Sequence, residues 1–380
     1  MLFNNGMFIK VDRTRCLNYL HHGVGCTHCV SNCPGLALEL TERKISLNKE
    51  NCLGCGLCLS DCPTQVFTAN HWDETSVVME VCRQKAEVTQ FFCEYHDNPF
   101  LSKKEKNKGA IQIPTCLSSL SKGAWYEIGL HTSVEIRVDK CTECPMNKCL
   151  ERLQLNVNTA IEWLEASGHT PEFTLVKNVG KVEKHKKLMA VSTGMKTTSR
   201  RDLFLSIFKQ GKEVITKVRE ENNISKGRKK KGMARSLLPA WQNRLEQTYT
   251  ANFQEGGRPV YWPSIQKSES CVNCSVCTTN CPTKALKVEI VNQKAVHTFT
   301  SGQCIDCRIC MLFCPTGSII RDREINVSPF EEEVLLEVPV VECKRCGETA
   351  ADQGNTLCFW CENEADDSEM INDVWKFLIG

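Results

Sequence analysis

Hydrophobic positions along this chain fall into short stretches that are separated by polar, cysteine-rich segments. Alternating apolar and polar residues predict small strands at 44–48, 287–291 and 295–299. Helical turns are expected after cysteine–proline pairs, since proline is tolerated in a first helical turn; they fall at 62–67, 281–286 and 314–319. Such small elements predict units with little hydrophobic core of their own.

Residues 76–168 follow a different pattern, with longer apolar stretches between amphipathic ones. Apolar, β-branched strands ending near cysteines are predicted at 76–82, 110–116 and 132–141. Helices are predicted at 119–129 and 150–168. Strands that alternate with helices predict a small parallel α/β layer, and such sheets carry their sites at the carboxyl ends of the strands.

The segment 169–250 contains no cysteine, and we predict amphipathic helices at 202–218 and 236–249. It carries 19 Lys and Arg against 7 Asp and Glu, whereas residues 322–373 carry 3 against 15. This polarity suits docking of charged partners, or pairing of the basic segment with the tail or with negatively charged clusters. No nucleic acid partner is expected, because the basic run at 226–232 lacks interleaved aromatic residues.

Composition then narrows the class of protein. A chain of 380 residues with 41% hydrophobic and 24% charged residues is long enough for two or three ordinary domains, yet it contains 26 cysteines. We expect no membrane span, because no long apolar run occurs, and a cytoplasmic location, because no export signal is visible. Under those conditions dense cysteine indicates metal binding rather than disulfides.

Four cysteine runs, each closed by proline, form an internal repeat. They are Cys16, Cys26, Cys29, Cys33; Cys52, Cys55, Cys58, Cys62; Cys271, Cys274, Cys277, Cys281; and Cys304, Cys307, Cys310, Cys314. Three follow C-x2-C-x2-C-x3-C-P, while nine residues separate Cys16 from Cys26. A cubane 4Fe-4S cluster takes three thiolates from one such loop. Zinc sites favour pairs of CxxC instead, so they are disfavoured here.

In these runs the chain resembles the bacterial two-cluster ferredoxins, and it does so twice. The resemblance implies that the fourth cysteine of each run ligates the neighbouring cluster. The implied ligand sets are Cys16, Cys26, Cys29, Cys62; Cys52, Cys55, Cys58, Cys33; Cys271, Cys274, Cys277, Cys314; and Cys304, Cys307, Cys310, Cys281. Near the insertion, His21, His22 and His28 are alternative ligands. We interpret them as loop histidines, because Cys16 is available and a looped-out insertion costs little closure entropy.

Six further cysteines lie between the two repeats: Cys82, Cys93, Cys116, Cys141, Cys144 and Cys149. A cysteine after the first strand, the stretch P-x-C-L-S-S-L and a late C-x-x-C-P resemble the iron–sulfur delta subunit of the hydrogenases that feed heterodisulfide reductase. The resemblance implies a further cluster, of the 2Fe-2S type, held by some four of the six. The site residues singled out are Cys82, Cys116, Cys141, Cys144 and Cys149. Inert buried cysteines, or a redox-active dithiol at Cys141 and Cys144, stay open.

The last four cysteines, Cys343, Cys346, Cys358 and Cys361, are spaced C-x2-C-x11-C-x2-C. Two such knuckles predict a closed tetrahedral thiolate site that folds a core-poor tail. Zinc is the metal expected, and a rubredoxin-like iron is the alternative.

These patterns predict an α+β protein: two ferredoxin-like dicluster modules flanking a small parallel α/β domain, a helical connector and a C-terminal zinc knuckle. The expected boundaries are 1–75, 76–168, 169–262, 263–325 and 326–380. The predicted function is single-electron transfer between a donor and a catalytic oxidoreductase through four 4Fe-4S clusters, as a subunit rather than a standalone enzyme. The resemblance suggests a molybdopterin oxidoreductase or a hydrogenase as partner. The alternative is a reductase with a thiol/disulfide or cluster-based site in the middle domain.

Overall fold

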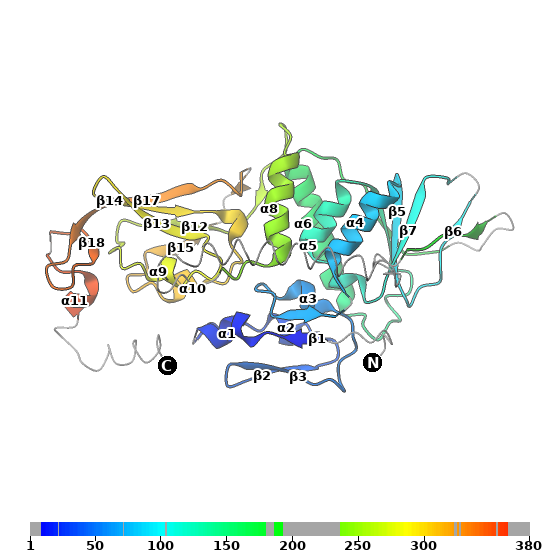
Figure 1. Ribbon diagram of the computed structural model, residues 1–380, viewed down its shortest axis with the longest axis horizontal. Coiled ribbons are helices and arrows are strands. Elements are labelled where there is room, and N and C mark those ends of the chain that lie inside the picture. Colours follow the sequence, from blue (N-terminus) through cyan, green and yellow to red (C-terminus); the bar gives the residue numbers. More distant parts are fainter. Residues whose placement is uncertain are drawn as a thin grey trace, which may run out of the picture.

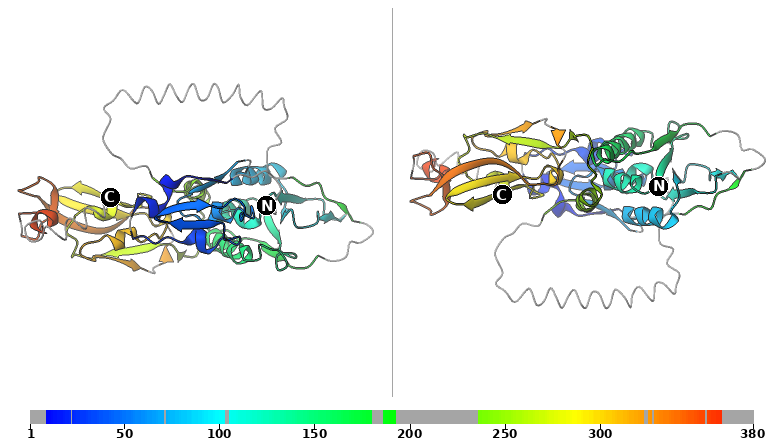
Figure 2. Two further views of the ribbon diagram at one scale, coloured as in Figure 1. Left: turned by 90° about the horizontal axis from the view of Figure 1, so that it is seen from below. Right: turned by 90° about the horizontal axis from the view of Figure 1, so that it is seen from above.

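The computed structural model describes residues 9–21, 23–70, 72–102, 105–179, 186–192, 236–322, 325–326, 328–354 and 356–363. The helix predicted at 202–218, the basic run at 226–232 and the end of the acidic tail lie outside these residues. No helix of the described part is long and apolar enough to cross a membrane. Helices and strands are mixed, and the first module lies across the junction of the middle domain and the second module (Figures 1 and 2).

The first module is built from two antiparallel strand pairs and short helices. Strand β1 (Ile9–Val11) pairs with β4 (Phe67–Ala69), and β2 (Leu38–Thr41) pairs with β3 (Lys44–Leu47), which confirms the strand predicted at 44–48. The helical pieces are η1 (Arg13–Arg15), α1 (Leu17–Leu20), α2 (His28–Ser31) and α3 (Leu57–Asp61). Its small core joins Leu38, Ile45 and Phe67 to the cysteines, so the thiols replace much of an ordinary apolar interior.

Helical turns after the cysteine–proline pairs were a wrong prediction. The one-turn helices precede each pair instead: α2, α3, α9 (Val276–Thr279) and α10 (Ile309–Leu312). A residue before proline is disfavoured in the helical region, and Cys62 before Pro63 accordingly has ψ 116°. The helix therefore ends at the fourth cysteine, and a turn leads into the next strand.

The second module repeats this plan and continues it into the tail. Strand β12 (Ser264–Lys267) pairs with β15 (Ile319–Asp322), and β13 (Leu286–Val291) pairs with β14 (Lys294–Phe299), which confirms the strands predicted at 287–291 and 295–299. Smaller elements are β11 (Val260–Tyr261), β16 (Ile325–Asn326) and η3 (Ser301–Gln303). Strand β17 (Glu333–Glu342) adds to β14, and β18 (Thr349–Ala351) adds to β17, before α11 (Phe359–Asn363). One sheet therefore crosses the boundary expected at residue 325.

The middle domain is the parallel α/β layer that the sequence predicts. Its sheet has the order β7 (Lys108–Ile113), β5 (Val88–Cys93), β8 (Ser133–Arg137), β9 (Phe173–Val176), and all of its pairings are parallel. Helices cover one face: α4 (Glu74–Gln84), α5 (Lys122–Gly129), α6 (Cys149–Ala166) and α8 (Ala240–Asn252) (Figure 1). The opposite face packs on the β6 (Phe100–Leu101) and β10 (Lys187–Leu188) pair through Phe92, Ala110 and Met189. The turn after β7 is η2 (Leu117–Ser119).

The strand predicted at 76–82 is helical, and this prediction was wrong. Asp73 caps α4 by accepting from the Thr75 N–H at 3.1 Å. Val77, Val78 and Val81 are buried at helical spacing, whereas strand alternation would have buried Met79, which is exposed. The true strand at this point of the chain is β5, the central strand, which the sequence analysis missed.

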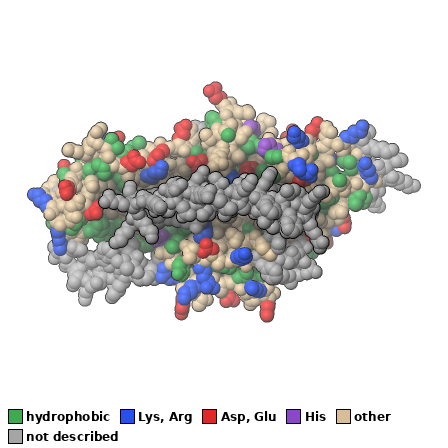
Figure 3. Space-filling view, viewed as in Figure 1, with side chains coloured by type: hydrophobic (Ala, Val, Ile, Leu, Met, Phe, Trp, Pro, Cys, Tyr) green, Lys and Arg blue, Asp and Glu red, His purple; other side chains and the backbone are tan. Residues whose placement is uncertain are grey.

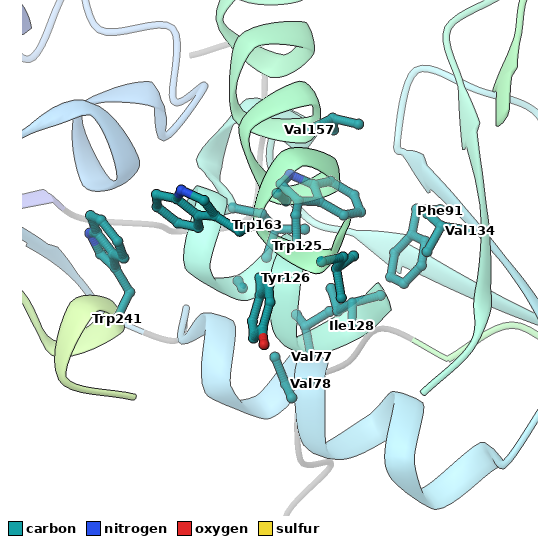
Figure 4. Close-up of a cluster of buried hydrophobic side chains, with 14 of the residues drawn as sticks. Val77, Val78, Phe91, Trp125, Tyr126, Ile128, Val134, Val157, Trp163 and Trp241 are labelled. Atoms are coloured by element: carbon teal, nitrogen blue, oxygen red, sulfur yellow. The ribbon is translucent and has the colours of Figure 1, made fainter. Parts of the chain in front are cut away.

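Helix α8 confirms the helix predicted at 236–249, but it belongs to the core of the middle domain. Its Trp241 faces Trp163 of α6, with ring centroids 6.4 Å apart (Figure 4). Trp163 also stacks on Trp262 at 4.7 Å. Aromatic pairs of this size dominate core energetics, so the chain returns from the long connector to complete this domain.

Residues 236–242 join the three parts. The Arg15 guanidinium donates to the Leu237 carbonyl at 3.0 Å, and the Leu237 N–H donates to the Pro282 carbonyl at 2.7 Å. Further along, Gln242 Nε2 donates to the Gly302 carbonyl at 2.7 Å. This segment therefore touches both dicluster modules while its helix packs in the middle domain.

Candidate iron–sulfur and metal centres

Left-handed backbone shapes the cysteine loops. The residue before the second cysteine has positive φ in all four runs: Gly25, Gly54, Asn273 and Asp306. The residue after it is left-handed in the three regular runs, at Gly56, Ser275 and Arg308, but not at Thr27 of the first run. These turns aim amide N–H groups at the sulfurs, as where Asp306 N–H donates to Cys304 Sγ at 3.4 Å. Loops of this kind form concave sites lined with thiols and amides.

The inserted first run still brings its cysteines together. Cys16, Cys26, Cys29 and Cys62 line one cavity, which matches the set implied by the ferredoxin resemblance. Asn18 closes the insertion: its Nδ2 donates to the Cys26 carbonyl at 2.6 Å, and its Oδ1 accepts from the Cys26 N–H at 2.9 Å. His28 lines the same cavity, His21 lies with its ring 6.0 Å from that of Phe313, and His22 falls outside the described residues.

The second site of the first module lies between the two loops. A neighbouring cavity is lined by Cys33, Cys52, Cys55 and Cys58, together with Cys29. The Cys33 sulfur accepts from the Ala37 N–H at 3.3 Å. Gly56 after the second cysteine approaches the middle domain so closely that a Cβ there would lie 2.8 Å from the Ser119 Cβ. This loop therefore requires glycine both for its φ of 75° and for the contact with η2.

The second module gathers its thiols in the same crossed way. Cys274 has Cys277, Cys271 and Cys314 as electrostatic neighbours, and Cys304 has Cys307, Cys281 and Cys310. Hydroxyls approach the fourth cysteines: Ser318 Oγ lies 3.3 Å from Cys314 Sγ, and Thr283 Oγ1 lies 3.7 Å from Cys281 Sγ. Both loops of the repeat thus contribute to each group of four.

Several thiols of these groups are hard to ionise in the absence of a cation. Burial raises the pKa of Cys29 to about 12, and its neighbours Cys62, Cys26 and Cys16 add to the rise. Burial likewise raises the pKa of Cys274 to about 11 and that of Cys310 to about 12. Several crowded thiolates are tolerated only beside positive charge, which iron supplies while displacing the protons. The donor sets therefore fit iron–sulfur clusters.

Four of the six middle cysteines meet at the carboxyl edge of the parallel sheet. Cys93 ends β5, Cys116 follows β7, Cys141 follows β8, and Cys144 completes the group around one cavity. Burial raises the pKa of Cys93 and of Cys141 to about 12, with the neighbouring thiols adding to the rise. The His96 ring lies beside them, with Nδ1 3.3 Å from Cys93 Sγ. This placement follows the rule for sites in parallel sheets.

Cys82 and Cys149 have other positions. Cys82 is exposed on α4 and does not line the cavity. Cys149 is buried at the start of α6, packed among Leu57 and Met146 with Cys55 and Cys116 beside them. Hydrogen bonds with Cys149 lower the pKa of Cys55 and that of Cys116. Cys149 therefore lies between a loop of the first module and the middle cavity.

The tail cysteines form a different kind of group. The ligand atoms of Cys343, Cys346, Cys358 and Cys361 all lie within 4.8 Å of one another, and no other such group occurs in the described part of the chain. Sulfur atoms 2.3 Å from a tetrahedral ion would be about 3.8 Å apart. The Cys346 and Cys358 sulfurs are 3.7 Å apart. Cys358 N–H donates to Cys343 Sγ at 3.2 Å, so a backbone amide supports this site as well.

Comparison with known proteins identifies the two repeats. Residues 24–66 and residues 270–318 each match the 4Fe-4S dicluster domain. The chain carries two 4Fe-4S dicluster domains. Over 90 residues it is 27% identical to the nitrate-inducible formate dehydrogenase iron-sulfur subunit of Escherichia coli strain K12, and equally to that of Shigella flexneri. Each alignment covers 22% of this chain and 31% of the relative.

These matches confirm an iron–sulfur electron-transfer role for the dicluster domains. They do not extend the comparison to the middle domain, whose resemblance to a hydrogenase delta subunit stays a prediction. Cys93 was not among the site residues predicted from the sequence, although it ends a stretch, VTQFFC, with strand composition. That composition was the available signal.

Proposed function

We propose that the chain is an electron-transfer subunit that passes single electrons between a donor and a catalytic oxidoreductase through four 4Fe-4S clusters. The observation that carries the proposal is that Cys16, Cys26, Cys29 and Cys62, from two loops, line a single cavity. The other three ligand sets follow the same crossed scheme: Cys52, Cys55, Cys58, Cys33; Cys271, Cys274, Cys277, Cys314; and Cys304, Cys307, Cys310, Cys281. Bound clusters supply one-electron chemistry. The chain's part is to hold the thiolates, exclude water and donate hydrogen bonds to sulfur.

The middle domain adds a further centre in this proposal. Cys93, Cys116, Cys141 and Cys144 would hold a cluster, and the resemblance to the hydrogenase delta subunit indicates the 2Fe-2S type. Their shared cavity supports this set of four in place of one that includes Cys82. The contacts of Cys149 with Cys55 and with Cys116 support a short route between the first module and the middle centre. Electrons would then pass through the first module into the middle domain.

The tail group would hold one structural zinc. The sulfur separation of 3.7 Å between Cys346 and Cys358 supports a single ion. Such a site contributes folding free energy directly, because the tail has few other buried residues.

The proposed partner is the catalytic subunit of an oxidoreductase complex. The similarity to a formate dehydrogenase iron-sulfur subunit supports such a partner, with a molybdopterin oxidoreductase or a hydrogenase as the candidates from the sequence. The predicted charge asymmetry would serve docking from segments outside the described residues. On the described face in Figure 3, Lys and Arg side chains are interspersed with Asp and Glu and form no large patch of one sign.

Metal analysis of the full chain, purified anaerobically, tests the proposal. We expect about sixteen irons from four cubanes, about two more from the middle centre, and about one zinc. Electron paramagnetic resonance of the reduced protein should show interacting 4Fe-4S signals. Iron near eight per chain after full reconstitution would contradict the four-cubane assignment.

A second candidate function is reduction of a substrate disulfide at the middle site. The contact of Cys93 Sγ with His96 Nδ1 at 3.3 Å favours it, because an imidazole beside a thiol assists thiol chemistry. Alkylation of the folded, metal-loaded protein separates the two functions. Protection of Cys93, Cys116, Cys141 and Cys144 supports a cluster, while labelling of Cys141 and Cys144 supports a dithiol. Exposed Cys82 provides the internal control for a free thiol.

A further inference from the structure

Lysine 267 and histidine 297 are buried together inside the second module. Lys267 is 8% exposed and His297 is 1% exposed. The Lys267 Nζ lies 2.8 Å from His297 Nδ1 and 3.6 Å from Cys277 Sγ. Lys267 comes from β12 and His297 from β14, so the pair also ties two separate sheets together.

A buried ammonium is costly unless negative charge compensates it. Among the described residues, no carboxylate forms an ion pair with Lys267. His297 cannot compensate, since burial and then the Lys267 charge lower its pKa to about 4 and leave a neutral acceptor. The group that remains within reach is the thiolate of Cys277, with the cluster it would ligate.

The first module places different residues at the corresponding positions. Leu38 and Leu286 each follow the fourth cysteine of a run by five residues. Leu38 pairs with Leu47, and Leu286 pairs with Phe299. Counting back two residues along the partner strands makes Ile45, which is 2% exposed, the counterpart of His297.

The lysine has no basic counterpart either. Strand pairing makes Val11 the counterpart of Lys267: Val11 pairs with Phe67 and Lys267 pairs with Ile319, and these two partners each follow the fourth cysteine of a run by five residues. Val11 is a partly buried aliphatic residue that packs against the small core of the first module. The first module therefore encloses its site with an aliphatic side chain, where the second encloses a cation.

We infer that Lys267, held by His297, is a positioning residue that raises the reduction potential of the cluster bound by Cys271, Cys274, Cys277 and Cys314. Reduction adds one electron to the cluster from the donor protein and breaks no bond. The ammonium stabilises the more negative reduced state and donates to a ligand sulfur, two of the levers that set cluster potentials. The inference rests on the proposed function, and it makes this cluster easier to reduce than its counterpart in the first module.

Redox titration of the full, metal-loaded chain, monitored by electron paramagnetic resonance, tests the inference. In Lys267→Met, the ratio of reduced to oxidised cluster at a fixed potential should fall at least about tenfold, which is about 59 mV for one electron. His297→Ile, which installs the residue of the first module, should produce a shift in the same direction. His297→Gln should retain most of the wild-type potential, because the amide oxygen still accepts from the ammonium. Lys287→Met, which removes an exposed lysine from β13, is the charge control.

Metal content separates this inference from the proposed function. If the wild-type protein lacks the third cluster, the proposed function is wrong. If the variants retain full iron and an unshifted potential, the inference is wrong while the function stands. If both Lys267→Met and His297→Ile lose only the iron of this cluster, the pair serves assembly, and the tuning role is equally overturned.

Discussion

In the first dicluster module, the cysteine loop that contains Gly56 packs against the middle domain, whereas the second module extends its sheet into the cysteine-rich tail. In the first, Ser60 Oγ donates to the Ser118 carbonyl at 2.6 Å, and Gly56 approaches Ser119. In the second, β17 pairs along β14 and then carries β18. The same cysteine spacing thus occurs in two different settings, one beside the middle group of cysteines and one beside the tail group of cysteines.

The spacing of the cysteines and the surroundings of each module therefore control separate properties. Spacing determines which four thiols meet, and even the nine residues that separate Cys16 from Cys26, in place of two, do not prevent it. The surroundings of a module determine the charge near its cluster sites, their exposure to solvent and the neighbouring group that can accept an electron. A substitution in one module, compared with the matched substitution in the other, separates the effect of cysteine spacing from the effect of the surroundings.

The largest expected effect comes from removing a cluster ligand in each module. Cys277→Ala should eliminate the third cluster and increase amide exchange across 271–320 by about a hundredfold or more, because cluster binding supplies much of the folding free energy. The first module should stay protected. The matched Cys29→Ala should loosen the first module and also the η2 contact, since that module supports the middle domain. Hydrogen exchange measures both, and equal loosening of both modules in either variant would contradict independent folding.

The tail should respond more locally. Cys343→Ser should remove the zinc and unfold residues 343–363, because that segment buries little besides three of its four cysteines. The β14–β17 ladder should remain, since it is held by the module rather than by the ion. Zinc analysis and hydrogen exchange check this outcome, with Cys82→Ser as the control that leaves every metal in place. Loss of protection in β14 would show that the tail supports the second module.

The link between the first module and the middle domain predicts a kinetic effect. Cys149→Ala should leave the iron content unchanged and slow electron arrival at the middle centre about tenfold, at the low end for residues that contact metal ligands. Cys149→Ser should recover much of the rate, because a hydroxyl still bridges Cys55 and Cys116. Rapid-freeze spectroscopy after reduction of the first module gives the rate. A loss of iron in both variants would instead make Cys149 a ligand.

Local patterns in the sequence predict a large part of this architecture. The grouping of fifteen of the sixteen cysteines depends on spacings of two and three residues, which the chain itself imposes, and the dicluster domains follow from it. The helices at 150–168 and 236–249 are also recognisable, because their apolar residues repeat at helical spacing. The β-branched stretch at 76–82 misled because the Asp73 cap outweighs strand propensity.

Features that depend on tertiary contacts could not be predicted from local patterns in the sequence. Cys93 joins the middle site because β5 lies between β7 and β8, an order that no local pattern gives. The position of Cys149 against Cys55 arises from packing between domains. Likewise Lys267 reads as an ordinary strand residue until strand pairing places it beside His297 and Cys277.

The smallest expected effect concerns the clamp on the inserted loop. Asn18 is 6% exposed and makes two hydrogen bonds with the backbone of Cys26. Asn18→Ala leaves both backbone groups without this partner, at a cost of about 1–3 kcal/mol for a buried group, and should speed iron loss from the first cluster to a chelator. The other three clusters should release iron at the wild-type rate. In the second module Asn280→Ala removes a bond to the Val276 carbonyl within α9, where no insertion has to be closed, and should leave iron release unchanged. Equal rates for the two variants would mean that the insertion is held by its other contacts, and that the irregular spacing of the first run needs no clamp.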